Sequence, residues 1–457
     1  MLLIKAKSTL YSRFVVAILN SFVLIFAFSI NAIGESNPTD SLGDQDRAEI
    51  IDSVASIFID RYVYPEVGLQ MDSVLKENLA DGVYDDQSSL SDFSQSIMRD
   101  LRQVSNDRHI WVEPIPEDRF YVAEGDTITD EQIFSKSLNN FGWMKVEWLA
   151  GAVGYIKVDK FEDVSYARET AEAALNFMAN CQIIIMDLRE HHGGHKNMNH
   201  LVVSYFFSEP TELSSLYWTY LDSMQESWTH ADIKGRPLYD KELYILTSNN
   251  TASGAEAFAY DMKHLGRATI VGENTAGAAH WSDWYEFPSL ELVVHLPVAR
   301  PINPVTKDSW EGTGVRPDII VPAEKALDTA YLEAVAKLKS STRDKKLQRL
   351  LEWTIPAIQA RLNPVEVDDV LASKIIGNYV HEDGKKKYNI SYENGSLLYN
   401  HHSGNSWIII PLTETLYGFE DNDDVRVKFI EDNSGAITEF QIMDQSGIIA
   451  RRARMND

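Results

Sequence analysis

The sequence predicts an α/β fold, and three observations carry that prediction. Strand-like apolar runs alternate with helix-like stretches between residues 140 and 340, as in folds that cover a parallel sheet with helices. Apolar residues recur at helical spacing from about residue 46 to residue 102, so a helical unit should come before the sheet. Short alternating strands separated by turns of Asn, Asp and Gly fill residues 368–457, which predicts a separate antiparallel β unit, a small barrel or curled sheet.

The first 34 residues differ from the rest of the chain. Lys5, Lys7 and Arg13 precede a long apolar run, and the small residues Ala32 and Gly34 follow it. This pattern is typical of a signal peptide, so we expect cleavage after about residue 34 and export to a bacterial periplasm or cell envelope. An uncleaved anchor is the alternative, because an apolar run of about twenty residues is long enough to span a bilayer.

Residues 46–130 are predicted to form the helical unit, which ends in a linker rich in Pro, Asp and Glu. The α/β core should then occupy residues 140–340. Its strands are expected at AVGYIKV (152–158), QIIIMDL (182–188), LYILTS (243–248) and ATIVGE (268–273). Its helices are expected at ETAEAALNFMA (169–179), MNHLVVSYFF (198–207) and GAEAFAYDMKHL (254–265). A basic helical stretch, 341–367, should form a bridge to the β unit.

Charge and cysteine content exclude several classes of function. Against 42 Lys and Arg the chain has 68 Asp and Glu, and this net charge of −26 argues against nucleic acid as a partner. Cys181 is the only cysteine, so no intrachain disulfide can form. The histidines near residue 195 lack the cysteine or carboxylate pattern of a metal site, so we expect neither a metal nor a cofactor. The sequence leaves the oligomeric state open.

The stretch LTSNNTASGAEAFAY (246–260) contains the first candidate catalytic residue, Ser253. A serine followed three residues later by a glutamate, here Glu256, is the spacing of a capping box, so Ser253 could simply begin a helix. The same position would suit a nucleophile, because the helix dipole and the first backbone N–H groups stabilise an oxyanion there. The spacing alone does not separate a cap from a nucleophile.

Other candidates lie near the ends of predicted strands, where open α/β sheets bind their ligands. Gly193 and Gly194 directly follow a buried strand and could present backbone N–H groups to an oxyanion, or could simply form a tight turn. A catalytic serine also needs a base and a group that orients the base. His109, His280 and Glu311 are the candidates for these roles.

The order of four segments resembles the C-terminal processing (tail-specific) serine peptidases. These segments are GYIKVDKF, IIIMDLREHHGG, LTSNNTASGAEAFAYDMKHLGRATIVGENTAG and EGTGVRPDIIV. Upstream, IDSVASIFIDRYVYPEVG and LRQVSNDRHIWV are similar to the interphotoreceptor retinoid-binding-protein-like branch of that family. The resemblance covers about residues 46–340. It implies a crotonase/ClpP-like core with a helical N-terminal unit, while the C-terminal β unit resembles lipocalin-like domains.

The resemblance also implies roles for individual residues. Ser253 would be the nucleophile, with the N–H groups of Gly193, Gly194 and Gly254 as oxyanion donors. Tail-specific members have a lysine base 25 residues after the serine, where this chain has Ala278. The Ser-Lys dyad is therefore absent, and the roughly 45 residues between His109 and Gly154 leave no room for the PDZ insert of that branch.

Tricorn-type relatives use a histidine and a glutamate instead of the lysine. Their motifs are similar to SNDRHIWV and WEGTGVRPD, which implies His109 as general base and Glu311 as its supporting carboxylate. The relatives have a serine before the histidine, where this chain has Arg108, and a cation at this position could bind a substrate carboxylate. We expect His280 to contribute to substrate binding as well.

The sequence therefore predicts an exported serine-type peptidase that acts on peptide or protein substrates. The alternative is a non-catalytic binder of apolar ligands on the same fold, which the missing lysine and the name of the similar branch suggest. The joint presence of Ser253, His109 and Glu311 favours the enzyme, because a pure binder needs none of them.

Overall fold

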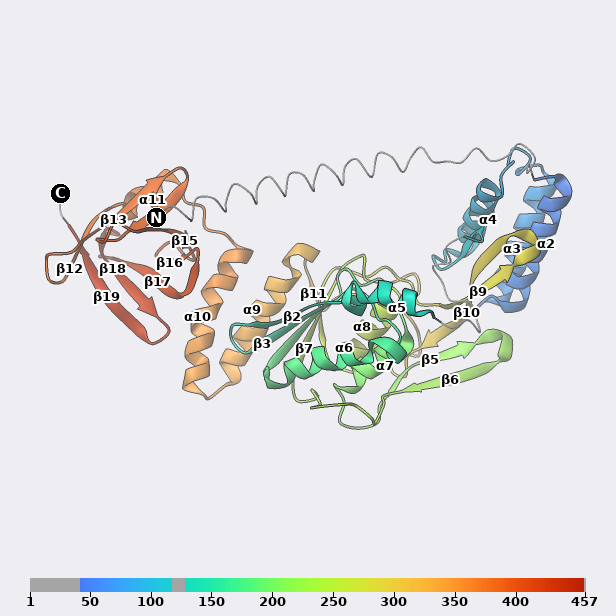
Figure 1. Ribbon diagram of the computed structural model, residues 1–457, viewed down its shortest axis with the longest axis horizontal. Coiled ribbons are helices and arrows are strands. Elements are labelled where there is room, and N and C mark those ends of the chain that lie inside the picture. The colour runs from blue at the N-terminus through green and yellow to red at the C-terminus, as the bar shows by residue number, and fades with distance from the viewer. Residues whose placement is uncertain (1–41, 117–127, 456–457) are drawn as a thin grey trace.

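The computed structural model describes residues 42–116 and 128–455. The expected signal peptide and part of the expected linker lie outside the described residues. No helix within the described ranges is both long enough and apolar enough to cross a bilayer. Figure 1 shows three regions along the chain: N-terminal helices at one end, an α/β core in the middle, and an antiparallel barrel at the other end.

Three helices form the N-terminal region and pack on an antiparallel sheet. They are α2 (Asp44–Arg61), α3 (Pro65–Ala80) and α4 (Leu90–Ser105). The sheet has the strand order β1-β10-β5-β6, and β9 also pairs with β10. Its strands are β1 (Trp111–Pro114), β5 (Glu212–Trp218), β6 (Ser223–Trp228), β9 (Trp281–Phe287) and β10 (Leu292–Ile302). This sheet was not among the predicted elements, and it joins segments that are far apart in the sequence.

The central sheet has six strands in the order β11-β8-β7-β4-β3-β2. Its strands are β2 (Trp143–Leu149), β3 (Val153–Val158), β4 (Ile183–Asp187), β7 (Glu242–Thr247), β8 (Thr269–Gly272) and β11 (Ile319–Ile320). All neighbours pair in parallel except β2, which is antiparallel to β3 at one edge. The four predicted core strands are confirmed as β3, β4, β7 and β8.

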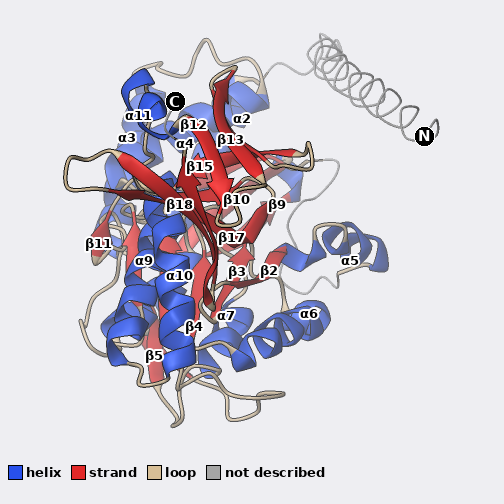
Figure 2. Ribbon diagram, turned by 90° about the vertical axis from the view of Figure 1, so that its left-hand side faces the viewer, coloured by secondary structure: helices blue, strands red, loops and turns tan. Residues whose placement is uncertain are grey.

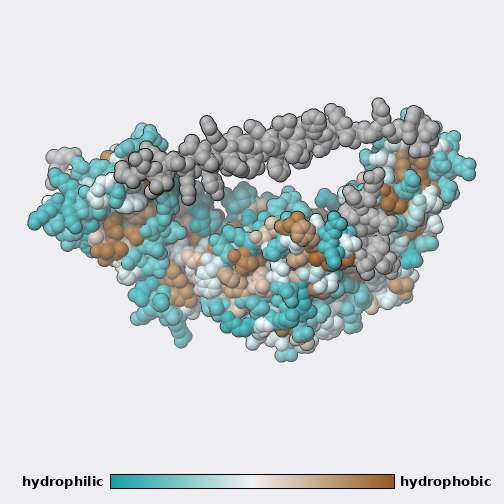
Figure 3. Space-filling model, in the orientation of Figure 1, coloured by the Kyte–Doolittle hydropathy of each residue, from teal (hydrophilic) through white to brown (hydrophobic). Residues whose placement is uncertain are grey.

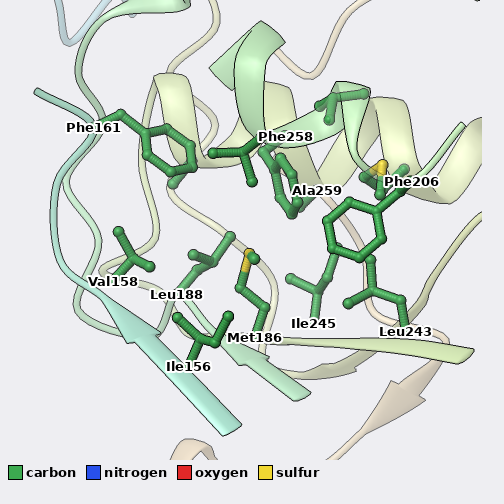
Figure 4. Close-up of a cluster of buried hydrophobic side chains, with 14 of the residues drawn as sticks. Ile156, Val158, Phe161, Met186, Leu188, Phe206, Leu243, Ile245, Phe258 and Ala259 are labelled. Carbon is green, nitrogen blue, oxygen red and sulfur yellow. The ribbon is translucent and has the colours of Figure 1, made fainter. Parts of the chain in front are cut away.

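Helices cover both faces of this sheet, which explains why its strands are continuously apolar. Ile184 and Met186 of β4 pack with α6 (Val164–Phe177), α7 (Lys196–Ser204) and α8 (Gly254–His264) on one face. Figure 4 shows this cluster, with Phe161 and Phe258 above the strands. Ile183 and Ile185 face the opposite side. Because successive strand residues point to opposite faces, a strand that is buried on both sides favours apolar residues at consecutive positions.

The opposite face of the sheet is covered by α9 (Ala323–Ser341) and α10 (Lys345–Leu362). Leu351 and Ile358 of α10 belong to the same apolar cluster as the sheet residues. The basic stretch that was expected to be a bridge is thus part of the outer layer of the core. It also contacts the barrel, because Trp353 Nε1 donates a hydrogen bond to the Asp423 carbonyl at 3.0 Å.

The C-terminal region is a closed antiparallel barrel of eight strands, which confirms the predicted antiparallel β unit. The strands are β12 (Gly377–His381), β13 (Lys387–Glu393), β14 (Ser396–Asn400), β15 (Ser406–Pro411), β16 (Leu416–Phe419), β17 (Asn422–Glu431), β18 (Ile437–Asp444) and β19 (Gly447–Arg454). The barrel closes where β12 pairs with β19. Figure 2 shows the barrel from its own end of the molecule.

The remaining helices are α5 (Asp130–Ser137) and α11 (Asp369–Ile375), and four short 3-10 turns accompany the larger elements. Much of the face seen in Figure 3 is hydrophilic, with brown patches over the barrel and beside the N-terminal helices. The structure as described is therefore mixed α/β with two further antiparallel sheets, one of them closed into a barrel.

Candidate active site

Three loops meet at one edge of the central sheet. They follow β4, β7 and β8, and because these strands are parallel, their carboxyl ends lie at the same edge. The loops bring residues 188–194, 248–253 and 273–280 together. Backbone bonds join them: the Leu188 amide donates to Leu246, and the Ala276 amide donates to Thr251. Separated motifs of the sequence thus form one site.

Ser253 is the residue immediately before α8. Its φ of 53° and ψ of −119° place it in a backbone region that serine rarely adopts. Holding a non-glycine residue there costs about 1–3 kcal/mol, which the surrounding contacts must supply. Within the described residues its side chain makes no capping hydrogen bond to α8, and Ser253 lines a cavity of about 80 Å³. Ser253 therefore differs from an ordinary helix cap.

Glu256 turns inward and holds the loop beside Ser253. Its buried carboxylate accepts hydrogen bonds from the backbone N–H groups of Ser253 (2.9 Å), Gly277 (2.7 Å) and Ala278 (2.9 Å), and from the Thr275 hydroxyl. Burial raises the pKa of Glu256 above its usual value, although these four hydrogen bonds oppose the rise. The glutamate of SGAE thus ties α8 to the loop after β8.

The glycines of the other loop lie directly against Ser253. A Cβ atom added to Gly193 would come within 2.8 Å of the Ser253 Cβ, and one added to Gly254 would come within 3.0 Å of the Gly194 oxygen. The Gly193 N–H already donates to His191 Nδ1 at 3.0 Å. Among the described residues, the N–H groups of Gly194 and Gly254 have no hydrogen-bond acceptor. These two are the amides left for an oxyanion in this conformation.

His191 is itself fixed in one protonation state. Burial, with the nearby charge of His192, lowers the pKa of His191 to about 3. The ring is therefore neutral at ordinary pH, and its Nδ1 can accept the hydrogen bond from Gly193. The Gly193 amide, which the sequence suggested as an oxyanion donor, is therefore already used within its own loop.

Asp107 joins the two candidate histidines. Its Oδ2 lies 2.6 Å from His280 Nδ1, and its Oδ1 lies 3.5 Å from His109 Nδ1. Tyr62 also donates its hydroxyl to Oδ2, at 3.2 Å. Burial opposes ionisation, but the contacts with His109 and His280 outweigh burial and hold the pKa of Asp107 well below its usual range. A buried carboxylate thus faces both imidazoles.

His109 lies in the loop between α4 and β1, and its side chain is only 13 % exposed. Its carbonyl accepts a hydrogen bond from His295 Nδ1 at 2.7 Å, and its amide donates to Asp107 at 2.9 Å, so the backbone is held on both sides. Burial lowers the pKa of a histidine, but the charges of Asp107 and Glu311 outweigh it and raise the pKa of His109. Neither ring nitrogen has a hydrogen-bond partner among the described residues.

His280 lines the same cavity as Ser253. Asp107 holds its Nδ1, while its Nε2 is buried and has no hydrogen-bond partner among the described residues. Glu311 fixes the backbone here, because its Oε2 accepts from the amides of Ala279 (2.6 Å) and His280 (3.0 Å). An imidazole bound to a carboxylate at Nδ1 and free at Nε2 is the arrangement of a general base in a serine triad.

Asp107, His280 and Glu311 each bring one atom that could bind a metal within 4.8 Å of the others. The shortest contact, 2.6 Å, joins Asp107 Oδ2 to His280 Nδ1, and Glu311 Oε2 lies 3.6 Å from the same nitrogen. A protonated Nδ1 that donates to Asp107 accounts for this geometry. We therefore interpret the three residues as a hydrogen-bonded network.

The lining of the cavity includes a further buried carboxylate, Asp261 of α8. Its Oδ1 accepts hydrogen bonds from the Ser214 amide (3.1 Å), the Ser214 hydroxyl (2.6 Å) and Asn303 Nδ2 (2.9 Å). Burial nevertheless raises the pKa of Asp261 to about 6. Trp281 and Trp310 line the cavity as well, so it combines polar and aromatic walls.

The structure brings some of the predicted site residues together and leaves others apart. Ser253, Gly194, Gly254 and His280 line one cavity. His109 and Glu311 are not part of its lining and contact it through Asp107 and the backbone at His280. The side chain of Arg108 is exposed and does not line the cavity.

Two residues with clear roles in this geometry were not predicted. Asp107 precedes His109 by two positions in SNDRHIWV, and an Asp-x-His spacing at the end of a helix could have indicated a carboxylate that orients an imidazole. Glu256 was considered only as a capping residue. Neither the contact between Asp107 and His280 nor the inward turn of Glu256 follows from spacing, because both depend on segments far apart in the chain.

Residues 152–321 match the model of the family described as Peptidase family S41. A carboxyl-terminal-processing protease from Picosynechococcus sp. is 28 % identical over 174 residues, which are 38 % of this chain and 40 % of that protein. A carboxyl-terminal-processing protease from Synechocystis sp. is 29 % identical over 171 residues, 37 % of this chain and 38 % of that protein. The chain thus spans about two fifths of the length of these curated relatives.

Among solved structures, the photosystem II D1 C-terminal processing protease has a TM-score of 0.40 and 14 % sequence identity. The match covers 62 % of this chain and 93 % of that one. The family match lies inside the region, residues 46–340, in which the four ordered segments resemble tail-specific peptidases. Residues 152–321 of the α/β core are thus similar to peptidase family S41.

Proposed function

We propose that this protein is a serine peptidase in which the Ser253 hydroxyl attacks a peptide carbonyl and forms an acyl-enzyme. One observation carries the proposal. Ser253 is held at a positive φ beside two amides without acceptors, and its cavity is also lined by a histidine whose Nε2 is free. A helix cap needs none of these features, whereas acyl transfer needs oxyanion donors and a base beside the hydroxyl.

The chemistry follows from these groups. A base removes the Ser253 proton as the oxygen attacks the carbonyl carbon, and the amides of Gly194 and Gly254 stabilise the resulting oxyanion. The base then returns the proton to the leaving amine, which breaks the peptide bond. Water, activated by the same base, hydrolyses the acyl-enzyme and restores Ser253.

The resemblance to tricorn-type peptidases assigns the base to His109 and its support to Glu311. The raised pKa of His109 and its contact with Asp107 are consistent with a base that is charged during the reaction. His280 is a second candidate, favoured because it lines the Ser253 cavity and Asp107 holds its Nδ1 at 2.6 Å. Asp107 would be the orienting carboxylate in either arrangement.

Replacing each histidine separates these two assignments. The base variant should lose about 10²–10⁴-fold in the rate of Ser253 acylation, while the other variant should change mainly substrate affinity. We would measure acylation in single-turnover experiments with His109→Ala and His280→Ala, using His264→Ala as a control for a half-buried histidine outside the cavity. A similar small loss in both variants would contradict a histidine base.

The resemblance to tail-specific peptidases also suggests the arrangement of the core and the class of substrate, and we include both in the proposal. The core would have the crotonase/ClpP-like arrangement, and peptides would enter without a PDZ module. Substrates would be peptides or proteins outside the cytoplasm, as the predicted signal peptide suggests. The acidic surface, with a net charge of −26, would disfavour strongly acidic substrates.

Covalent labelling tests the proposal directly. A fluorophosphonate probe should modify the purified protein, and peptide mapping should locate the adduct on Ser253. A peptide substrate in excess should slow the labelling, because both occupy one cavity. Absence of labelling together with tight binding of an apolar ligand would instead support the non-catalytic binder.

A further inference from the structure

The C-terminal barrel has one filled end and one open end. At the filled end, Ile375 of α11 belongs to the interior cluster, Val367 packs against it, and the Tyr379 hydroxyl donates to the Ile375 carbonyl at 2.7 Å. The other end carries the turns of four hairpins, which join β12 to β13, β14 to β15, β16 to β17, and β18 to β19. A cavity of about 510 Å³ opens there. A barrel of eight strands is wide enough to hold one small ligand.

Arg452 of β19 points into this cavity. In the register of the barrel it pairs with Phe440 of β18, and Ala450 pairs with Ile442. Directly paired residues share a face, and Phe440 is part of the interior cluster, so Arg452 and Ala450 also face inward. Arg452 is only 8 % exposed and lines the cavity.

The guanidinium of Arg452 lacks a charged partner within the described residues. Its Nη1 donates to the Arg451 carbonyl at 2.7 Å, and its Cζ lies 4.3 Å from the centre of the Tyr388 ring. Its Nε is buried and unpaired, and no carboxylate lies within 4.0 Å in the part of the chain described, not even Asp421 at the rim. A buried cation of this kind is costly unless an anion pairs with it.

The neighbouring Arg451 makes the contrast clear. It faces outward, is exposed, and pairs with Glu439 at 2.7 Å. The chain thus places one arginine in an ordinary surface ion pair and the next one in a cavity without a counterion. The unpaired Nε of Arg452 and its free N–H groups form a fork that fits a carboxylate in two-point contact.

The walls above Arg452 are apolar. Tyr399, Phe419 and Ile442 line the cavity, and the rim exposes Trp407 (40 %) and Ile449 (57 %) to solvent. Large apolar side chains at an opening contribute little to the stability of a barrel. They would instead bury the apolar body of a ligand whose head lies at Arg452.

We propose that the open end of the barrel binds an amphipathic carboxylate, a fatty-acid-like molecule whose carboxylate pairs with Arg452 and whose aliphatic chain leaves between Trp407 and Ile449. The site is separate from the Ser253 cavity, so the inference does not depend on peptidase activity. The volume of about 510 Å³ is in the range of pockets that hold one small ligand.

Binding of a fluorescent dansylated undecanoate to the full chain tests this proposal. Dodecanoate should displace the probe at concentrations at least about 10-fold lower than dodecanol, which has the same chain without the charge. This comparison uses the unmodified protein, so it does not depend on the folding of a variant. Equal displacement by the acid and the alcohol, or no binding of the probe, would overturn the proposal.

Variants of the two adjacent arginines locate the head group. Arg452→Gln should remove the preference for dodecanoate, Arg452→Lys should retain part of it, and Arg451→Gln should leave it unchanged. Near-ultraviolet circular dichroism, which reports on the barrel aromatics, verifies that each variant is folded. Preference for the acid that persists in folded Arg452→Gln, or disappears in Arg451→Gln, would contradict the assignment of Arg452.

Discussion

Helices α4 and α8 begin with the same sequence pattern and use it differently. In α4, Ser89 precedes Asp92 by three residues, just as Ser253 precedes Glu256 in α8. Ser89 has an extended backbone (φ −106°, ψ 147°), and its hydroxyl accepts a hydrogen bond from the Asp92 amide at 3.1 Å. Ser253 has a positive φ and makes no such bond within the described residues. One serine is a cap, and the other is free for chemistry.

The acidic residues of the two patterns explain the difference. Asp92 stays at the surface, where the Ser89 hydroxyl donates to its Oδ2 at 2.8 Å. Glu256 is fully buried and binds the loop after β8 through Gly277 and Ala278. Tertiary contacts of Glu256 thus hold Ser253 at a positive φ, which differs from the extended backbone of an ordinary capping residue. A capping pattern predicts a helix start, but its use depends on what the helix packs against.

Removing the Ser253 hydroxyl should have the largest effect. Ser253→Ala is expected to reduce peptide turnover by at least about 10³-fold and to abolish fluorophosphonate labelling, because the proposed nucleophile is lost. The melting temperature should stay within a few degrees, since the hydroxyl makes no capping bond. A folded Ser253→Ala protein with normal turnover would show that Ser253, like Ser89, is not needed for catalysis. That result would contradict the contrast between the two serines.

The next largest effect concerns the loop that follows α4. Asp107→Asn should slow acylation about 10²-fold and move the acid limb of its pH profile to lower pH. Asp107 raises the pKa of His109 against the opposing effect of burial, so removing its charge lowers that pKa and extends the neutral base form to lower pH.

The control for this experiment is Asp100→Asn in α4 itself. Asp100 is also buried, but its hydrogen bonds come from Tyr84 (2.7 Å), Asn78 (2.9 Å) and the Arg99 guanidinium (3.2 Å), none of which lines the Ser253 cavity. This variant should leave the pH profile unchanged. If the acid limb stays in place in Asp107→Asn, His109 is not the group that sets it.

A smaller effect is expected from the second buried carboxylate of α8. The folded-state pKa of Asp261 is raised to about 6, from 3.8, so its contribution to stability is fully present below pH 3.8 and is lost as pH rises through about 6. Asp261→Asn should therefore raise the free energy of unfolding by up to ~3 kcal/mol at pH 8 and change it little below pH 3.8.

This substitution is nearly isosteric, and Oδ1, which accepts all three short hydrogen bonds, is retained. Urea unfolding of both proteins at pH 3.5 and at pH 8 would measure the difference. A stability gain that is equal at both pH values would show that the charge of Asp261 is not its cause.

The smallest effects should have opposite signs in the two helices. Ser89→Ala is expected to lower the free energy of unfolding by about 1 kcal/mol and to leave activity unchanged, because it removes a cap. Ser253→Gly should raise the same free energy by roughly 1 kcal/mol, because glycine adopts a positive φ without strain. Thermal unfolding of both variants checks the signs, and stabilisation by Ser89→Ala would reverse the comparison.

Much of the core could be predicted because its signals are local. The apolar runs that became β3, β4, β7 and β8 are short and bounded by turns, and burial on both faces of the sheet requires such runs. The strand alternation within residues 368–457 predicted an antiparallel barrel or curled sheet for similar reasons. The sheet of β1, β10, β5, β6 and β9 escaped prediction because its strands come from distant segments and mix polar with apolar residues.

The candidate site likewise contains residues that could be predicted from the sequence and contacts that could not. Ser253 and the glycine pair could be found from sequence, because each follows a buried strand whose end is visible in the apolar pattern. The hydrogen-bond partners of the histidines could not be found from sequence. Asp107 and His280 are 173 residues apart, yet their side chains lie 2.6 Å apart, and no periodicity encodes that distance.

By itself, the sequence determined the inner strands of the core sheet, the antiparallel β unit and the polar residues at the ends of the core strands, since these follow from local patterns of apolar and turn residues. Only the tertiary structure decided the positive φ of Ser253, the use of the Gly193 amide by His191, and the sharing of Asp107 by two histidines. These features depend on contacts between loops that meet at one edge of the sheet. Such contacts are set by packing across the fold, which short-range spacing does not record.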